Sequence, residues 1–237
     1  MKKYVAEMTS KRGYTIVELL VAIAISGIFM GSIYSVYTTQ QRATLGQEQV
    51  SAMQRNLRSA MYFMEKEIRM AGCDPTGRAG ARIETAQKTG IRFTSDITDD
   101  PGTGDPDGDV GDAGESIGYY RNAEGDLFRD LTDDGDDTNG TRIAENIDAI
   151  NFVYLDKDGN NLADDGLGNV TDPENRARIR SVQVTVVART GKKDPRYTDS
   201  TSYQNKIPET IFTPSGDAVH FRRKLLSTSI KCRNLGL

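Results

Sequence analysis

The sequence has no tryptophan, a single histidine, His220, and two cysteines among its 237 residues. A zinc site needs several Cys and His ligands, and Ser-His-Asp or Cys-His catalysis needs a histidine to spare. This chain offers little of either. We therefore predict no catalytic residues and no organic cofactor, and expect a protein that is not an enzyme.

The sequence also lacks a large excess of either basic or acidic residues. Lys and Arg number 30 against 34 Asp and Glu, a formal net charge of −4, which excludes a generally basic nucleic-acid binder. Basic residues gather locally near the C-terminus, at Arg222, Arg223, Lys224, Lys231 and Arg233. Such clusters more often solvate a strand edge than bind phosphates, so we predict no direct nucleic-acid contact.

The charges that are present are distributed unevenly. Residues 1–12 hold four basic residues and one acid, whereas residues 96–137 hold fifteen acids and two arginines. Between them, residues 19–41 are uncharged and mostly apolar, and as a helix they would measure roughly 35 Å, enough to cross a bilayer. The basic N-terminal flank predicts that this end faces the cytoplasm and that everything after Gln41 lies outside it.

One carboxylate, Glu18, lies at the edge of this apolar segment. An unpaired charge at membrane depth costs about 2.5 to 3.5 kcal/mol on insertion scales, so Glu18 needs a partner. The apolar run is longer than that of a secretory signal peptide, and no small-x-small cleavage site follows it. We therefore expect a retained single-pass membrane helix.

Residues 11–20 read Lys-Arg-Gly-Tyr-Thr-Ile-Val-Glu-Leu-Leu: a basic leader, a glycine, an aromatic residue, and a glutamate five positions after the glycine. This stretch resembles the type III signal of type IV prepilins and type II secretion pseudopilins. The resemblance implies that a prepilin peptidase cleaves between Gly13 and Tyr14 and that the Tyr14 amine is then methylated. The family usually has Phe at this position, where this chain has Tyr14.

Cleavage would supply the partner that Glu18 needs. A free α-amino group has a pKa near 7.7 to 8.0, so the Tyr14 amine would be largely cationic at neutral pH. It could pair with the Glu18 carboxylate of its own or a neighbouring subunit inside a filament, which would give Glu18 a role in assembly. The alternative is an uncleaved anchor.

Helical periodicity continues beyond the apolar segment. Apolar residues recur three or four apart from Leu45 to Ala71, and no proline occurs before Pro75, so we predict one helix from about Tyr14 to Ala71. Its methionine stripe indicates core packing rather than a binding groove. The predicted divisions are a leader peptide at 1–13, a transmembrane and filament-core helix at 14–41, an amphipathic helix at 42–72, and an extracytoplasmic β-rich domain at 73–237.

After Pro75 the sequence changes to short apolar runs separated by acidic loops. The predicted strands are 90–94, 116–120, 127–130, 147–155, 179–188 and 221–230. The alternation of Val182, Val184 and Val186 predicts antiparallel strands with one face on the long helix. The predicted fold class is α+β, a long N-terminal α-helix packed on an antiparallel β-sheet. The segments 96–114, 132–140, 156–175 and 191–217 are predicted to be loops.

Several longer runs, among them residues 57–75, 144–156 and 179–187, are similar to the PilW-like minor pilins, which are related to the J-type minor pseudopilins of type II secretion. The resemblance implies a pilin-like fold and a subunit that initiates or tips a filament. It implies the inner membrane, with a periplasmic domain, and then a cell-surface filament as locations, and other minor and major pilins as partners. A type II secretion pseudopilin and a tip adhesin are the open alternatives, and a membrane-anchored hydrolase is the least favoured.

Two acidic loops carry oxygen ligands at alternate positions. The first has Asp156, Asp158 and Asn160, followed by Asp164, in the spacing with which an EF-hand loop begins. The second has acids at 105, 107 and 109, followed by Asp112 and Glu115. Neither has the glycine and bidentate glutamate of an EF-hand, so the prediction is a looser calcium site, and the alternative is a pair of solvated turn-forming loops.

The two cysteines, Cys73 and Cys232, are far apart in the sequence. An oxidising exterior and an even count favour a Cys73–Cys232 bridge. It would close a loop of about 160 residues and contribute roughly 4 to 5 kcal/mol in the chain-entropy model. The alternative is two isolated buried thiols.

Calcium binding at the first loop predicts that millimolar calcium raises the melting temperature of the protein. The combined substitutions Asp156→Ala and Asp158→Ala should remove that increase, because they delete two of the four predicted ligands. Thermal unfolding with and without calcium measures the effect. No shift in the unsubstituted protein would contradict the calcium prediction and favour the solvated loops.

Overall fold

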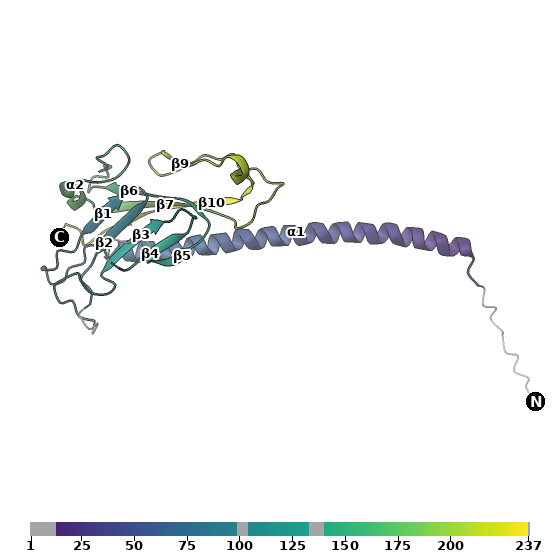
Figure 1. The fold of residues 1–237 in the computed structure, drawn as a ribbon, viewed down its shortest axis with the longest axis horizontal. Helices are drawn as coiled ribbons and strands as arrows, with labels where there is room; N and C mark the ends of the chain where they lie inside the picture. Colours follow the sequence, from purple (N-terminus) through teal and green to yellow (C-terminus); the bar gives the residue numbers. More distant parts are fainter. Residues whose placement is uncertain (1–12, 99–103, 133–139, 237) are drawn as a thin grey trace, which may run out of the picture. The chain divides into compact units, whose positions relative to one another are not determined.

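The computed structural model describes residues 13–98, 104–132 and 140–236, and the chain divides into two compact units, Met1–Gln47 and Glu48–Leu237 (Figure 1). The predicted leader peptide lies outside the described residues except for Gly13. The long helix α1 spans Ile16–Ile68, a few residues shorter at each end than predicted. Its first half belongs to the first unit and its second half to the second.

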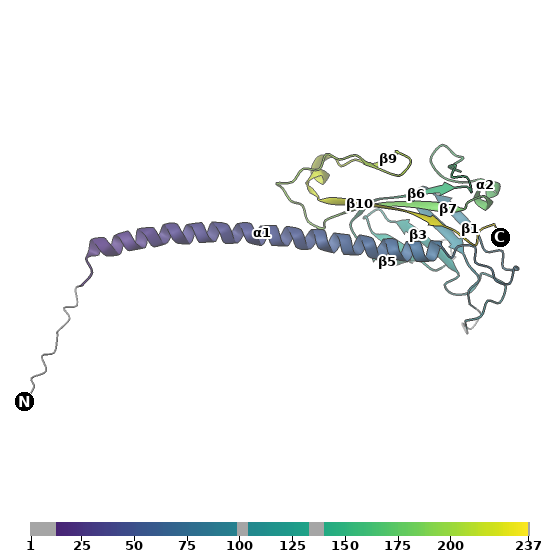
Figure 2. The same ribbon diagram turned by 180° about the vertical axis from the view of Figure 1, so that it is seen from behind.

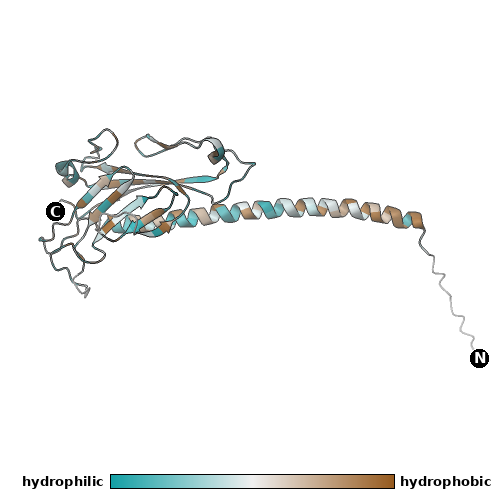
Figure 3. Cartoon of the chain, in the orientation of Figure 1, coloured by the Kyte–Doolittle hydropathy of each residue, from teal (hydrophilic) through white to brown (hydrophobic). Residues whose placement is uncertain are grey.

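In the first unit α1 is apolar and has no core of its own. By length and composition α1 is long and apolar enough to cross a membrane, and the most apolar window of 18 residues has a mean hydropathy of 2.3 with none of it buried. Figure 3 shows these N-terminal turns largely in the hydrophobic colour. Large side chains such as Ile28, Phe29 and Tyr34 are exposed within the unit.

A turn that closes with a glycine follows the end of α1. Gly72 adopts a φ of 75°, a left-handed conformation that side chains other than glycine rarely take, and its N–H donates to the Thr94 carbonyl. A Cβ placed on Gly72 would lie 2.3 Å from Leu235 Cδ2, so a larger residue here would also have to move the Leu235 side chain. The chain therefore leaves the helix through a positive-φ turn at Gly72 that packs close to Leu235.

The second unit contains two antiparallel sheets and a small hairpin (Figures 1 and 2). The larger sheet is a five-stranded meander in chain order. Its strands are β1 (Ile83–Gln87), β2 (Gly90–Thr94), β3 (Ser116–Arg121), β4 (Leu127–Asp130) and β5 (Thr141–Ala144). The smaller sheet has the order β10-β7-β6, with β6 at Ile147–Leu155, β7 at Ser181–Arg189 and β10 at Arg223–Lys231.

The remaining elements are short and lie in connections. The helix α2 spans Pro173–Ala177, the hairpin pairs β8 (Tyr203–Gln204) with β9 (Thr210–Phe212), and a 3-10 helix covers Gly216–His220. The predicted α+β class is confirmed, and all six predicted strands are present. The expectation of one sheet and of a plain loop over 191–217 is wrong, because β8 and β9 fall within that segment and the strands divide between two main sheets.

The core of the second unit forms where the second half of α1 meets both sheets. The buried residues of α1 recur three or four apart, and they are Met53, Leu57, Ala60, Met61, Met64 and Ile68. They join buried side chains from the five-stranded sheet, such as Phe93, and from the three-stranded sheet, such as Val184. The methionine stripe is therefore core, as predicted.

A polar clamp adds to this apolar contact. The Glu67 carboxylate of α1 accepts hydrogen bonds from Arg129 Nε at 2.8 and 3.0 Å and from the Tyr119 hydroxyl, which come from neighbouring strands β4 and β3. Burial raises the pKa of Tyr119, and the Glu67 carboxylate beside it raises it further. Both oxygens of the partly buried Glu67 carboxylate accept hydrogen bonds. This clamp of Glu67, Tyr119 and Arg129 therefore fixes α1 against the five-stranded sheet.

Truncation of the α1 stripe should destabilise the second unit. Leu57 is 1% exposed, and Leu57→Ala should lower the free energy of unfolding by about 2 to 5 kcal/mol, through lost burial and a cavity. Leu45→Ala is the matched control, since Leu45 lies on the same helix and is 51% exposed. Denaturant unfolding in detergent, followed by near-ultraviolet circular dichroism, measures both. Equal losses in the two variants would contradict the assigned core.

Candidate functional site

The first turn of α1 is closed by a reciprocal pair of side chains. The Glu18 N–H donates to Thr15 Oγ1 at 3.2 Å, and the Thr15 N–H donates to Glu18 Oε2 at 2.9 Å. The Thr15 hydroxyl also donates to Glu18 Oε2, at 3.0 Å. This is a capping box, which satisfies two backbone N–H groups that a helix start leaves without partners. Glu18 is thus a helix cap as well as the acid at the edge of the apolar segment.

The predicted cleavage position lies directly before this cap. Gly13 is exposed and outside any helix, and a Cβ placed on it would meet no atom within 4 Å. Tyr14 is 93% exposed within its unit. Among the residues that the structure describes, none covers Gly13 or Tyr14, and only Thr15, Ile16 and Val17 separate Tyr14 from Glu18.

The first predicted calcium loop is held together by its own hydrogen bonds. Asp156 Oδ1 accepts the N–H groups of Asp158 and Asn160, each at 2.9 Å, and Asp156 Oδ2 accepts from the Asn160 amide at 3.1 Å. The hydrogen bond from the Asn160 side chain lowers the pKa of Asp156 the most, and the backbone N–H groups lower it further. Asp158 forms an ion pair with Lys157. These oxygens face N–H donors rather than one another.

Asp164 is engaged in the same way. Its Oδ1 accepts from the Thr171 N–H and hydroxyl, both at 2.8 Å, and its Oδ2 accepts from the Asp172 N–H at 3.0 Å. The structure does not bring Asp164 into a shared cage with the three earlier ligands. A calcium ion at Asp156, Asp158, Asn160 and Asp164 would share the Asp156 and Asp164 oxygens with these donors, and the site stays a prediction.

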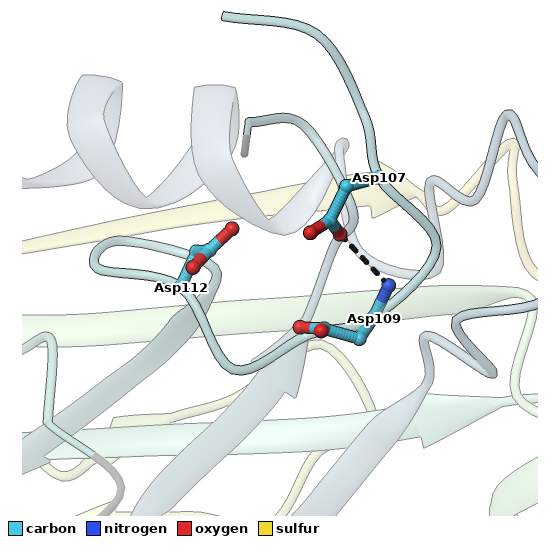
Figure 4. Close-up of side chains that lie close together, drawn as sticks. All are labelled: Asp107, Asp109 and Asp112. Atoms are coloured by element: carbon cyan, nitrogen blue, oxygen red, sulfur yellow. Dashed lines mark hydrogen bonds between the residues drawn. The ribbon is translucent and has the colours of Figure 1, made fainter. Parts of the chain in front are cut away.

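The second acidic loop partly converges. Oxygens of Asp107, Asp109 and Asp112 lie within 4.8 Å of one another, and Figure 4 shows the three carboxylates facing a common space. Asp105 is outside this cluster. Glu115 is fully buried and accepts the N–H groups of Ile97 and Thr98 at 2.8 and 3.0 Å. The structure therefore brings Asp107, Asp109 and Asp112 together, three of the five acids. Glu115 instead holds the start of the loop through the N–H groups of Ile97 and Thr98.

Both cysteine thiols are free in the structure, with Cys73 half-buried and Cys232 buried. Burial raises the pKa of Cys232 to about 12, so this thiol is protonated at neutral pH. The segments that carry the two residues lie together, because a Cβ on Gly72 would contact Leu235. The Cys73–Cys232 bridge stays a prediction.

The basic residues near the C-terminus do not form one patch. Lys224, Lys231 and Arg233 are exposed, but the Arg223 side chain is fully buried. Its guanidinium pairs with Asp148 at 2.5 Å and with Asp199 at 3.1 Å. The interpretation of Arg223 as part of a solvated edge is therefore wrong. The sequence carries no local signal for this pairing, because the partners lie 75 and 24 residues away.

The structure combines a long N-terminal helix with antiparallel sheets, which is the architecture of pilin-like proteins. The helix is apolar at its start, is capped at its first turn, and packs its C-terminal part on the sheets. Residues 8–34 match the prokaryotic N-terminal methylation motif. Residues 116–234, half of the chain, match the family described as Type IV Pilus-assembly protein W. The chain belongs to this PilW family and is a PilW-like type IV minor pilin.

Among solved structures, the chain is similar to a type IV-like pilin from Thermus thermophilus. The two are 15% identical in sequence, with a TM-score of 0.49, and the similarity covers 77% of this chain and 97% of the other. No curated protein matches the chain.

Acidification should loosen the loop that Asp164 organises. The backbone N–H groups of Thr171 and Asp172 hold the pKa of Asp164 well below its usual range. The resulting stabilisation is present above the ordinary aspartate pKa and is lost as the pH falls through the lowered folded-state pKa. Asp164→Asn should therefore flatten the loss of stability between about pH 4 and pH 2. Urea unfolding across that range measures it, and identical slopes would contradict the assignment.

Proposed function

We propose that the chain is processed by prepilin peptidase between Gly13 and Tyr14 and then built into a type IV pilus filament as an initiating or tip subunit. The observation that carries this proposal is the position of Glu18: it caps the first turn of α1, at the start of an uncharged apolar segment and inside the methylation motif. A carboxylate placed there suits a neighbouring cation better than it suits lipid.

The geometry of the cap leaves room for that cation. Both bonds from Thr15 go to Glu18 Oε2, while Oε1 accepts no hydrogen bond from any residue that the structure describes. Cleavage would create an ammonium group on Tyr14, and methylation of this amine would keep its positive charge at neutral pH. Oε1 is then available to the Tyr14 amine of the same chain or of the next subunit, while Oε2 keeps the cap.

The location and partners follow from the same residues. We propose that residues 14–41 cross the inner membrane before assembly and join the filament core afterwards, with residues 73–237 outside the cytoplasm. The proposed partners are the prepilin peptidase and other minor and major pilins. The description of the matched family names pilus assembly, which favours a pilus over a type II secretion filament.

Mass spectrometry of the N-terminal peptide tests the processing step. We expect methylated Tyr14 as the first residue, both in membranes and, at low stoichiometry, in sheared surface filaments. Low stoichiometry distinguishes a minor from a major subunit. An intact Met1 leader in every fraction would contradict the proposal.

Two substitutions separate the cap from the charge. Glu18→Gln keeps an oxygen acceptor for the Thr15 N–H but removes the negative charge, whereas Glu18→Ala removes both. We expect both variants to insert into the membrane and neither to enter filaments, because each lacks the ion pair. Glu48→Gln, at an exposed position of the same helix, is the matched control and should assemble normally. Immunoblots of membranes and sheared filaments give the result; normal assembly of Glu18→Gln would contradict the charge pairing.

A further inference from the structure

The three-stranded sheet ends in a long, regular strand with one free edge. In the order β10-β7-β6, β10 pairs with β7 alone, and all nine residues from Arg223 to Lys231 are in register with β7 without a bulge. No proline interrupts it. Short strands, bulges, prolines and charged side chains are the usual means of protecting an edge, and β10 has only the last of these, in Lys224 and Lys231 near its two ends.

The alternation of the ladder shows which groups face outward. The Thr190 N–H donates to the Arg222 carbonyl at 2.9 Å, and the Cys232 N–H donates to the Arg180 carbonyl at 3.0 Å. In an antiparallel pair, every second residue bonds to the neighbouring strand, so the even-numbered residues of β10 face β7. The N–H and C=O groups of the odd-numbered residues, such as Leu225, Ser227 and Ser229, therefore point away from the sheet.

These outward groups bond to no residue that the structure describes. The other outer strand of this sheet, β6, is different: the Phe152 N–H donates to the Lys88 carbonyl at 2.8 Å, and the Tyr154 carbonyl accepts from Leu162 at 2.9 Å. The β6 pairing also contains a bulge near Ile147. Of the two outer strands, β10 is the one whose whole length is available for pairing with a further strand.

The charges around this edge point to the kind of strand that fits. Lys224 near one end, and Lys231 and Arg233 at the other, are exposed and form no ion pair with any described residue. A second copy of β10 would bring its own basic residues against these, which like-charge repulsion disfavours. An acidic strand would place carboxylates opposite them.

We propose that the free edge of β10 receives an extended, acidic segment of another pilin subunit, which adds a strand antiparallel or parallel to β10. Main-chain hydrogen bonds from the odd-numbered residues supply the contact, and the flanking lysines select an acidic partner. The identification of the partner as a pilin rests on the proposed function. The expectation that the edge binds an acidic strand rests only on the backbone groups and charges of β10.

A proline at an odd-numbered position tests the edge without breaking the sheet. Ser227→Pro removes an outward N–H and fills the outward space with the ring, while the bonds to β7 come from residues 226 and 228. Ser227→Ala is the matched control, because it also loses the hydroxyl contact with Thr185 but keeps the N–H. We expect Ser227→Pro to reach membranes normally and to be lost from filaments, and Ser227→Ala to assemble like the unsubstituted chain.

Assembly of Ser227→Pro at the normal level would overturn the proposal. Because a proline variant can fail to fold, amide hydrogen exchange of the unsubstituted full-length chain in detergent provides a second test. The probe is the peptide acetyl-Glu-Val-Thr-Val-Glu-Val-Thr-Val-Glu-amide, and the control replaces each Glu by Lys. We expect the acidic peptide to slow exchange of amides 225, 227 and 229 by about tenfold or more, with the even-numbered amides already protected in its absence.

Equal protection by both peptides, or by neither, would overturn the acidic-strand proposal. Protection that rises with protein concentration without peptide would instead show self-pairing of β10, and would also overturn it. The peptide experiment needs no filament. If the chain never enters filaments, the proposed function fails, and the exchange data still decide whether the edge binds an acidic strand.

Discussion

The rest of the structure depends on the burial of one helical stripe. The side chains of Met53, Leu57 and Met64 contact the interior of the second unit, where both main sheets contribute to the same core. Each fully buried residue of this size contributes about 1.5 to 3 kcal/mol relative to exposure, so the stripe as a whole strongly favours the packed position of this part of α1. The Glu67 clamp then fixes the orientation of the helix, because an ion pair and a hydroxyl must meet one carboxylate.

The same helix has no comparable partner over its first half. From Ile16 to Tyr37 large apolar side chains are exposed within their unit, and none of them is buried by the residues of that unit that the structure describes. Exposed apolar surface on this scale usually marks contact with lipid or with another protein. One continuous helix thus has two different environments, and the change between them occurs where the apolar run ends and the amphipathic pattern begins.

Local patterns explain which features could be predicted from the sequence. Helical spacing predicted α1, short apolar runs between turns predicted strands such as β2 and β6, and the alternating valines predicted β7, because these signals depend on neighbouring residues. Strands β1 and β5 are as short as β2 and β4, but their residues, Ile-Glu-Thr-Ala-Gln and Thr-Arg-Ile-Ala, contain no apolar run and therefore indicate little. The division into two sheets and the burial of Arg223 depend on contacts across many residues. The Thr15–Glu18 cap has a local signal, the Thr-x-x-Glu pattern of a capping box, in addition to the charge of Glu18.

Several of the acidic side chains form hydrogen bonds within the fold instead of presenting a free charge at the surface. Asp156, Asp164 and Glu115 accept hydrogen bonds from their own loops, so they organise backbone that would otherwise lack partners. The Arg223 side chain is likewise buried and paired with two aspartates inside the fold. A count of charges therefore overstates what the surface presents, and only the structure shows which remain free. Near β10 the free ones are basic and flank an open row of backbone groups, so the local charge of this edge is opposite in sign to the net charge of the chain.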